Sequence, residues 1–150
     1  MKPFMLKQSG VALVEFALIL PLLLLLTFIT TEFGRALFQY NILTKSVRDG
    51  ARYLTPYNPG DTAKIAIAKN LVVYGSPTNT GVPLVIGLTT LQVSAAWLPV
   101  GPAPAINTVT VTVTGYVFRP LLASAFGLSF ANGNGDIPFA PISATIRAPL

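Results

Sequence analysis

The stretch QSGVALVEFALILPLLLLLTFITTEF, residues 8–33, decides the architecture of this 150-residue chain. Between Lys7 and Glu32 its only charged side chain is Glu15. The run from Val11 to Thr31 has the length, roughly 20 residues, that an α-helix needs to cross the hydrocarbon core of a bilayer. We therefore predict one transmembrane helix over residues 11–31.

A cleavable secretory signal is the alternative interpretation of this run. Its apolar region would be shorter, and small side chains would be expected where the run ends. Here the run ends in TTEF, residues 30–33, without the small-residue pattern of a signal cleavage site. The sequence therefore favours a helix that stays in the membrane.

Basic residues flank the predicted helix on both sides. Lys2 and Lys7 precede it, and Arg35, Lys45 and Arg48 follow it. Because the side with more lysine and arginine usually stays in the cytoplasm, this near balance does not decide the orientation. We expect the N-terminus to be cytoplasmic, because a short basic leader is easily left behind while a small β-rich domain is exported.

The composition excludes several classes of function. The chain has no cysteine and no histidine, which removes disulfides, thiolate chemistry and the commonest general base and metal ligand. Its net charge is +5, but its 10 basic residues are scattered and form no nucleic-acid-binding cluster. No phosphate-binding or dinucleotide-binding fingerprint is present. We expect no enzyme activity and no cofactor.

The carboxylate of Glu15 requires an explanation. A charged side chain in the hydrocarbon costs about 2.5 kcal/mol or more, and such groups usually have a partner or a function. In one interpretation Glu15 lies near the membrane edge and reaches the headgroups. In the other it pairs with a cation at the same depth. Lys7 lies about 12 Å away along a helix axis, so that cation would come from another chain.

The arrangement GVALVEF, residues 10–16, resembles a type IV prepilin site: a basic leader ends in Gly, and Glu stands at the fifth position of the following apolar helix. The resemblance implies that a membrane peptidase cuts between Gly10 and Val11 on the cytoplasmic side. It also implies that Glu15, followed by Phe16, acts in assembly by pairing with the freed amine of a neighbouring subunit. Val11 replaces the usual Phe and leaves N-methylation open.

A narrower resemblance rests on longer stretches. VALVEFALILPLLLLL and EFGRALFQYNILTKSVRDGARYL, with TVTVTVTGYVFRPLL and ISATIRAPL further on, look like the TadE-like family, pseudopilins of the tight-adherence (Tad, Flp, type IVc) pilus system. The resemblance implies the bacterial inner (cytoplasmic) membrane as location. The implied partners are other Tad pilins and pseudopilins, a prepilin peptidase and the pilus assembly platform. Entry into the filament, a place at its tip and a priming role all stay open.

Pro21 interrupts the apolar run. Proline removes one helical hydrogen bond and kinks or loosens a helix, although membrane helices tolerate it. We predict a kink at Pro21. It is either a harmless bend or a flexible point that lets the helix leave the bilayer for a filament.

The helix is predicted to continue beyond the membrane to Leu54, about 66 Å in all. Thr55-Pro56 then ends it, because a residue before proline avoids helical backbone angles. An apolar stripe with one polar member recurs at helical spacing along this stalk. The stripe is either core against the protein's own sheet or a contact between subunits, and it consists of Phe33, Leu37, Tyr40, Thr44, Val47, Ala51 and Leu54.

The remaining chain predicts a small α+β head. Asp61 and Gly75 bound a short helix ending at Tyr74. Alternation of apolar and polar residues predicts strands over residues 91–97, 108–114 and 142–146. The stalk helix would cover this small antiparallel sheet, as in type IV pilins. Gly115 falls on the valine face of the middle strand, where it would permit a bulge or a close-packed aromatic ring.

Two segments of the head remain ambiguous from sequence. PLLASAFGLSF, residues 120–130, is either a covering helix or an exposed contact patch. NGNGD, residues 132–136, is predicted to be a turn, because asparagine and glycine tolerate positive φ. Its alternating Asn132, Asn134 and Asp136 begin like a calcium loop, but Ile137 replaces the loop glycine.

The predicted organisation has four parts: a leader (1–10), a transmembrane helix (11–31), its extracytoplasmic continuation (32–55) and an α+β head (56–150). We interpret the chain as a minor pilin or pseudopilin of a Tad pilus, matured by prepilin peptidase. The alternative is an uncleaved single-pass envelope protein whose periplasmic head binds or scaffolds.

Overall fold

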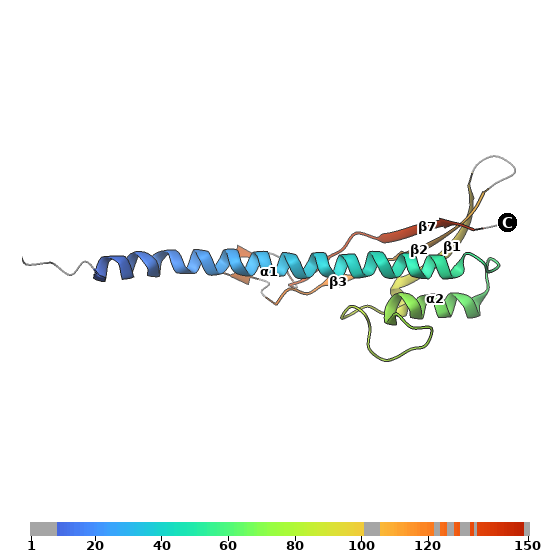
Figure 1. Cartoon of the computed structure of the whole chain (residues 1–150), viewed down its shortest axis with the longest axis horizontal. Coiled ribbons are helices and arrows are strands. Elements are labelled where there is room, and N and C mark those ends of the chain that lie inside the picture. Colours follow the sequence, from blue (N-terminus) through green and yellow to red (C-terminus); the bar gives the residue numbers. More distant parts are fainter. Residues whose placement is uncertain are drawn as a thin grey trace, which may run out of the picture.

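The computed structural model describes residues 9–100, 106–121, 124–125, 128–129, 133 and 135–148. Helix α1 (Ser9–Leu54, 46 residues) forms the long axis, and most of the described chain gathers around its C-terminal half (Figure 1). The other elements are α2 (Thr62–Tyr74), the 3-10 helix η1 (Thr90–Gln92), and strands β1 (Val93–Val100), β2 (Ile106–Val113), β3 (Val117–Phe118), β4 (Ser124–Ala125), β5 (Leu128–Ser129), β6 (Ile137–Pro138) and β7 (Ile142–Arg147).

Both helices end where their capping residues predict. Helix α1 stops at Leu54, directly before Thr55-Pro56. The side chain of Asp61 accepts a hydrogen bond from the backbone N–H of Lys64 at 3.1 Å and so caps the first turn of α2. Gly75 follows α2 with φ of 67°, a left-handed conformation that glycine adopts without strain.

The main sheet is antiparallel, with strand order β1-β2-β7. On central strand β2 the valines Val109, Val111 and Val113 are fully or almost fully buried. The threonines between them point to the other face, where the hydroxyl of Thr110 bonds that of Thr145 across the strands at 2.8 Å. The period-two pattern of residues 108–114 is therefore confirmed.

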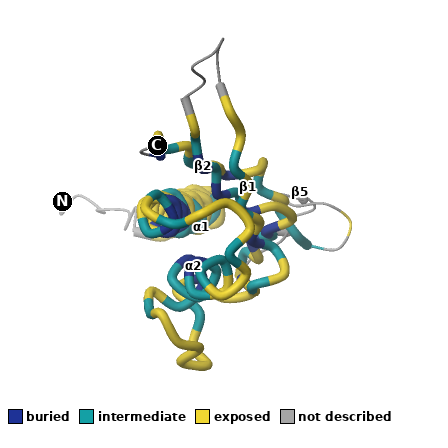
Figure 2. Tube along the Cα trace, turned by 90° about the vertical axis from the view of Figure 1, so that its right-hand side faces the viewer, coloured by how far each residue is buried: buried dark blue, intermediate teal, exposed yellow. Residues whose placement is uncertain are grey.

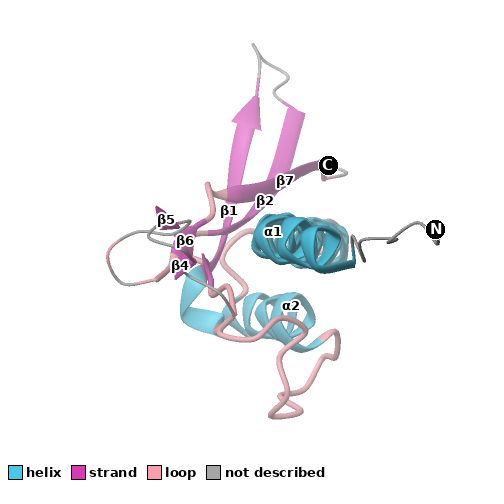
Figure 3. Ribbon diagram, turned by 90° about the vertical axis from the view of Figure 1, so that its left-hand side faces the viewer, coloured by secondary structure: helices cyan, strands magenta, loops and turns pink. Residues whose placement is uncertain are grey.

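Helix α1 lies between this sheet and α2, so its C-terminal half contacts both (Figure 3). Buried positions concentrate where these elements meet (Figure 2). Because apolar burial is the main stabilising term in folding, this junction is the core of the head. From the helices it includes Leu43, Val47, Ala51, Leu54, Ala68, Val72 and Val73.

The predicted stripe on the stalk divides into two parts. Val47 and Leu54 are completely buried, whereas Phe33 and Leu37 remain 64% and 47% exposed. Tyr40 is 46% exposed. The C-terminal part of the stripe is thus core against the protein's own sheet, and the N-terminal part remains open to other contacts.

Two details of the predicted strands were wrong. Leu91 does not begin a strand, because it lies in η1 and is 94% exposed. The side chain of Gln92 explains this turn, since it accepts a hydrogen bond from the Thr89 N–H and donates one to the Gly115 carbonyl, each at 2.8 Å. Gly115 in turn leaves the valine face: β2 ends at Val113, and Gly115 turns the chain with φ of 68°.

Segment 120–130 is not a helix where the structure describes it. Ser124–Ala125 and Leu128–Ser129 form an antiparallel pair of short strands. In the predicted turn, Asn132 and Asn134 lie outside the described residues, while the Asp136 carboxylate lies 3.5 Å from Nε of Arg119. Among the residues that the structure describes, no group of three or more potential metal-ligating side chains occurs.

Two glycines of α1 provide a matched test of the packing of α1 on α2. A Cβ atom at Gly50 would lie 2.6 Å from a methyl group of Val72, whereas one at Gly34 would meet nothing within 4 Å. We expect Gly50→Ala to destabilise the head by about 1–3 kcal/mol, the usual cost of overpacking. Gly34→Ala should be neutral or stabilising by up to about 1 kcal/mol, because alanine favours helix.

The measurement is urea unfolding of the full chain in detergent micelles, followed by the fluorescence of the single tryptophan, Trp97. Equal midpoints for the Gly50→Ala and Gly34→Ala variants would contradict the close approach of the two helices.

Candidate functional site

The predicted cleavage and assembly residues lie at the free end of α1. The side chains of Val11 and Phe16 are 72% and 58% exposed, and Gly10 and Glu15 are also exposed. Together with Val14 and Leu18, Gly10, Val11 and Glu15 surround a shallow apolar hollow on one side of the helix. Because positions four apart share a helix face, the backbone at Val11 and the carboxylate of Glu15 lie one turn apart on one side.

Glu15 stands without an ion pair among the residues that the structure describes. The basic leader, with Lys2 and Lys7, falls outside the described residues. Within the described ranges the structure thus presents an acid on an exposed apolar surface, and no described cation of the head forms an ion pair with it.

The N-terminal part of α1 has the properties of a membrane span. In the described chain α1 is the helix long and apolar enough to cross a bilayer, and no residue in the most apolar window of α1 is buried. A core helix of a soluble protein would instead be mostly buried. The structure therefore carries one N-terminal apolar helix of the kind that anchors a single-pass protein. Through Pro21 the helix continues without a break.

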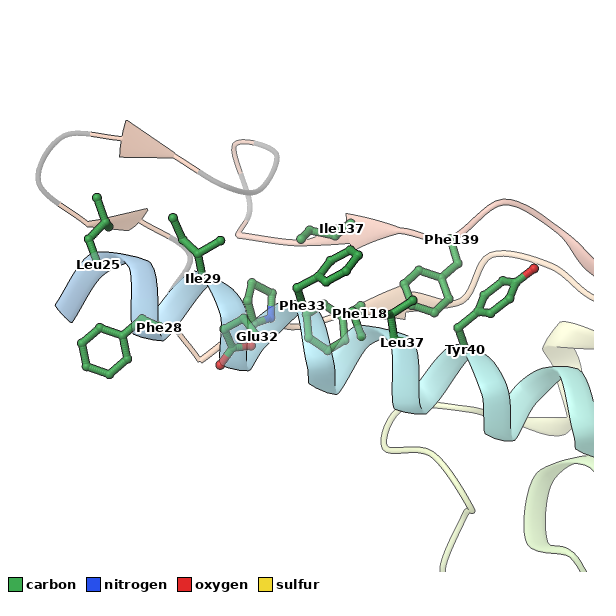
Figure 4. Close-up of a pocket in the computed structure, with 12 residues that line it drawn as sticks. Leu25, Phe28, Ile29, Glu32, Phe33, Leu37, Tyr40, Phe118, Ile137 and Phe139 are labelled. Carbon is green, nitrogen blue, oxygen red and sulfur yellow. The ribbon is translucent and has the colours of Figure 1, made fainter. Parts of the chain in front are cut away.

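An apolar groove of about 410 Å³ runs along α1 where the predicted span meets the stalk (Figure 4). One wall is α1 itself, from Leu25 to Tyr40. The other wall belongs to the small β3–β6 sheet and its neighbours, and consists of Phe118, Pro120, Ile137 and Phe139. The exposed half of the stalk stripe, Phe33, Leu37 and Tyr40, therefore lines this open groove.

Aromatic contacts fix the position of the β3–β6 sheet against α1. The ring of Phe139 lies 6.0 Å from Tyr40 and 5.4 Å from Tyr116, both in edge-to-face arrangement. The hydroxyl of the buried Tyr116 is a donor with two acceptors in reach, the side-chain oxygen of Gln39 at 2.9 Å and the carbonyl oxygen of Ile86 at 3.2 Å. Tyr116 thus links α1, the loop after α2 and the end of the main sheet.

Two ion pairs lie beside the groove. On α1, Nη1 of Arg35 donates to both carboxylate oxygens of Glu32, at 2.6 and 2.9 Å. On the head, Arg119 pairs with Asp136. The Arg35 guanidinium also lies 5.4 Å from the centre of the Phe118 ring, a cation–π distance, so the two pairs are close to each other. Spacing along the sequence did not predict the second pair.

Comparison with known families gives a match for the N-terminal part of the chain. Residues 10–52 match the model of the family described as TadE-like protein. This segment is TadE-like. No curated protein and no solved structure matches the chain.

The match confirms the resemblance drawn from the sequence over α1. It begins at Gly10, includes Glu15 and ends two residues before the end of α1. Neither of the C-terminal stretches that resemble the family lies within it. The TadE-like segment thus contributes the apolar helix, the exposed stripe and one side of the core.

Burial raises the pKa of the Tyr116 phenol, and the nearby charge of Arg35 opposes this rise. The unfolded chain ionises this phenol near the ordinary value of about 10. The stabilisation from the neutral phenol is therefore fully present below that pH and is lost as pH rises through the higher folded-state pKa.

We expect Tyr116→Phe to lower the free energy of unfolding near neutral pH by about 0.5–1.5 kcal/mol, the value of a lost hydrogen bond. Above about pH 10 the difference between the two proteins should shrink, because only the wild type has this phenol to ionise. The measurement is urea unfolding of the wild type and the Tyr116→Phe variant, both full-length and in micelles, from neutral pH to above about pH 10. A difference that stays constant with pH would contradict the prediction.

Proposed function

We propose that the protein is a minor pilin or pseudopilin of a Tad (Flp) type IV pilus, matured by prepilin peptidase between Gly10 and Val11. One observation carries the proposal: Gly10 and Glu15 stand at prepilin spacing on an exposed TadE-like helix that is otherwise uncharged from Val11 to Thr31. An acid without a partner in such a helix is costly unless assembly supplies a cation.

Cleavage itself creates that cation. It frees the amine of Val11, which lies one turn, about 6 Å along the axis, from Glu15. Each mature subunit then carries one acid and one amine at nearly the same depth. A small stagger between parallel helices brings the amine of one subunit to the acid of the next. Breaking such a buried pair by removing one partner costs about 3–5 kcal/mol, enough to control assembly.

The apolar surface of α1 supports the same proposal. Outside a bilayer, side chains such as Leu13, Leu18 and Phe16 would face water, because they are 70%, 75% and 58% exposed in the single chain. Packing among other pilin helices would cover them. Phe38, 67% exposed on the stalk, extends this surface beyond the predicted span. Large exposed apolar surfaces of this kind usually mark an interaction site.

In this proposal the protein has no catalytic role and needs no cofactor. Before assembly α1 holds it in the bacterial inner membrane, with the head outside the cytoplasm. Its partners are the prepilin peptidase, the assembly platform and other Tad pilins or pseudopilins.

The N-terminus of the protein recovered from membranes tests maturation. With the cognate prepilin peptidase, intact mass and N-terminal sequencing should show a chain that begins at Val11, and without the peptidase the leader should remain. Gly10→Leu should retain the leader even with the peptidase. A Cβ at Gly10 meets nothing within 4 Å, so a block would not reflect a steric clash within the fold.

Gly34→Leu is the matched control, because Gly34 is equally free of close neighbours and lies outside the cleavage site. This variant should be cut normally. A leader that stays on the wild type in both strains would instead identify an uncleaved, membrane-anchored envelope protein.

The assembly role of Glu15 is tested by Glu15→Gln. The amide keeps the shape of the side chain and removes its charge, so cleavage should proceed while pilus assembly falls sharply. Glu32→Gln makes the same chemical change beyond the predicted span and should leave assembly largely intact, since the partly exposed pair with Arg35 contributes little. Pili counted by electron microscopy and recovered by shearing provide the measurement. Normal piliation with Glu15→Gln would refute the pairing.

A further inference from the structure

The head reaches back along α1 into the predicted span. Strands β4 and β5 lie level with Leu25 and Ile29 along the helix (Figures 1 and 4). The predicted transmembrane run continues to Thr31, so this part of the head lies on the membrane side of the boundary. A head that stood clear of the bilayer would have all its elements beyond Glu32.

Charged residues mark one common boundary on the helix and on the head. On α1 the pair of Glu32 and Arg35 follows the uncharged part of the span, and on the head Arg119 pairs with Asp136. Arg35 and Arg119 line the same small cavity, which places both pairs at one level. Between Arg119 and Asp136 the sequence contains no charged residue.

The excursion begins with an exposed apolar side chain. Leu121 is 80% exposed, although it directly follows the groove residue Pro120. At the same level the groove is walled by Leu25, Phe28 and Ile29 of the span. Its membrane end is therefore continuous with the surface of α1 that lipid would cover.

From this geometry we infer that Leu121 and the β4–β5 pair are inserted in the membrane leaflet on the head side, with the two ion pairs at headgroup level. Leu25 lies about 9 Å along the helix axis from Thr31. That depth agrees with the roughly 5–10 Å to which interfacial segments enter a bilayer. Acyl chains then fill the membrane end of the groove, and the arginines contact lipid phosphates.

The shallow depth is physically important for such short strands. Backbone groups at open strand edges are costly in the hydrocarbon centre, but headgroups and interfacial water can satisfy them near the surface. The ion pairs are favourable at the same place, because Arg35 and Arg119 keep their charged ends in the polar layer. The inference requires that α1 spans a membrane and does not depend on leader cleavage or on a pilus.

A fluorescent label at position 121 tests this contact. The chain has no cysteine, so Leu121→Cys in the full-length protein takes one environment-sensitive label. The protein is placed in vesicles of phosphatidylethanolamine and phosphatidylglycerol. We expect blue-shifted emission, strong quenching by a nitroxide near the top of the lipid acyl chains, and several-fold weaker quenching by iodide than at an exposed site. A nitroxide near the acyl-chain end should quench less.

Labels at two further positions provide reference values for quenching in water and inside the span. Ala63→Cys puts the label on an exposed residue at the start of α2, at the end of the head far from the span (Figure 1). Leu18→Cys puts it inside the span, where the deeper nitroxide should quench more than at position 121.

Two outcomes would overturn the inference. A label at position 121 that iodide quenches as strongly as the one at position 63 would mean that the head stands off the membrane. A blue-shifted label that neither lipid nitroxide quenches would mean that another protein copy, rather than lipid, covers this surface.

Discussion

The contact between the C-terminal half of α1 and the valine face of β2 supports the rest of the structure. Val47 and Ala51 from the helix, and Val109 and Val111 from the strand, are completely buried there. A three-stranded sheet with one apolar face needs cover, and α1 supplies it. Helix α2 packs against both α1 and β1 and completes this core. In the part of the head that the structure describes, the core is therefore built on the helix that also serves as its anchor.

As a result, the two ends of α1 are suited to different surroundings. Towards its C-terminus α1 has a single apolar face and an exposed polar side that includes Lys45 and Arg48, the pattern expected of a helix at a protein surface in water. Towards its N-terminus it is apolar on all sides and exposed, as suits lipid or a bundle of similar helices. The change occurs over Glu32 to Tyr40, which includes the Glu32–Arg35 ion pair and the part of the groove nearest the stalk.

Local signals predicted much of the fold. Asp61 and Gly75 bound α2 as expected, and valine alternation located β2, because capping and strand periodicity act through neighbours in sequence. Leu91 was misassigned because the Gln92 side chain, which bonds to Gly115 far along the chain, diverts the backbone into a turn. The division of the stalk stripe depends on where the sheet ends along α1, and helical spacing carries no such information.

The candidate sites show the same division between local and long-range information. The isolation of Glu15 follows from sequence, because it depends on the absence of nearby charge. The groove and its ion pairs depend on Phe118, Phe139, Arg119 and Asp136 meeting across a long connection. The sequence signal for the groove is the spacing of Tyr116 and Phe118 after Gly115. It places two aromatic side chains on one face of the chain but does not show which residues they contact.

The unbroken course of α1 has a mechanical consequence. A helix of 46 residues is a rod of about 69 Å, and the sheet is packed directly onto its far end. No linker separates the part in the membrane from the part in the head, so a rotation or axial pull applied near Gly10 reaches the sheet through the same rod. The molecule is built to transmit torque and tension along one line, and its head moves as its anchor moves.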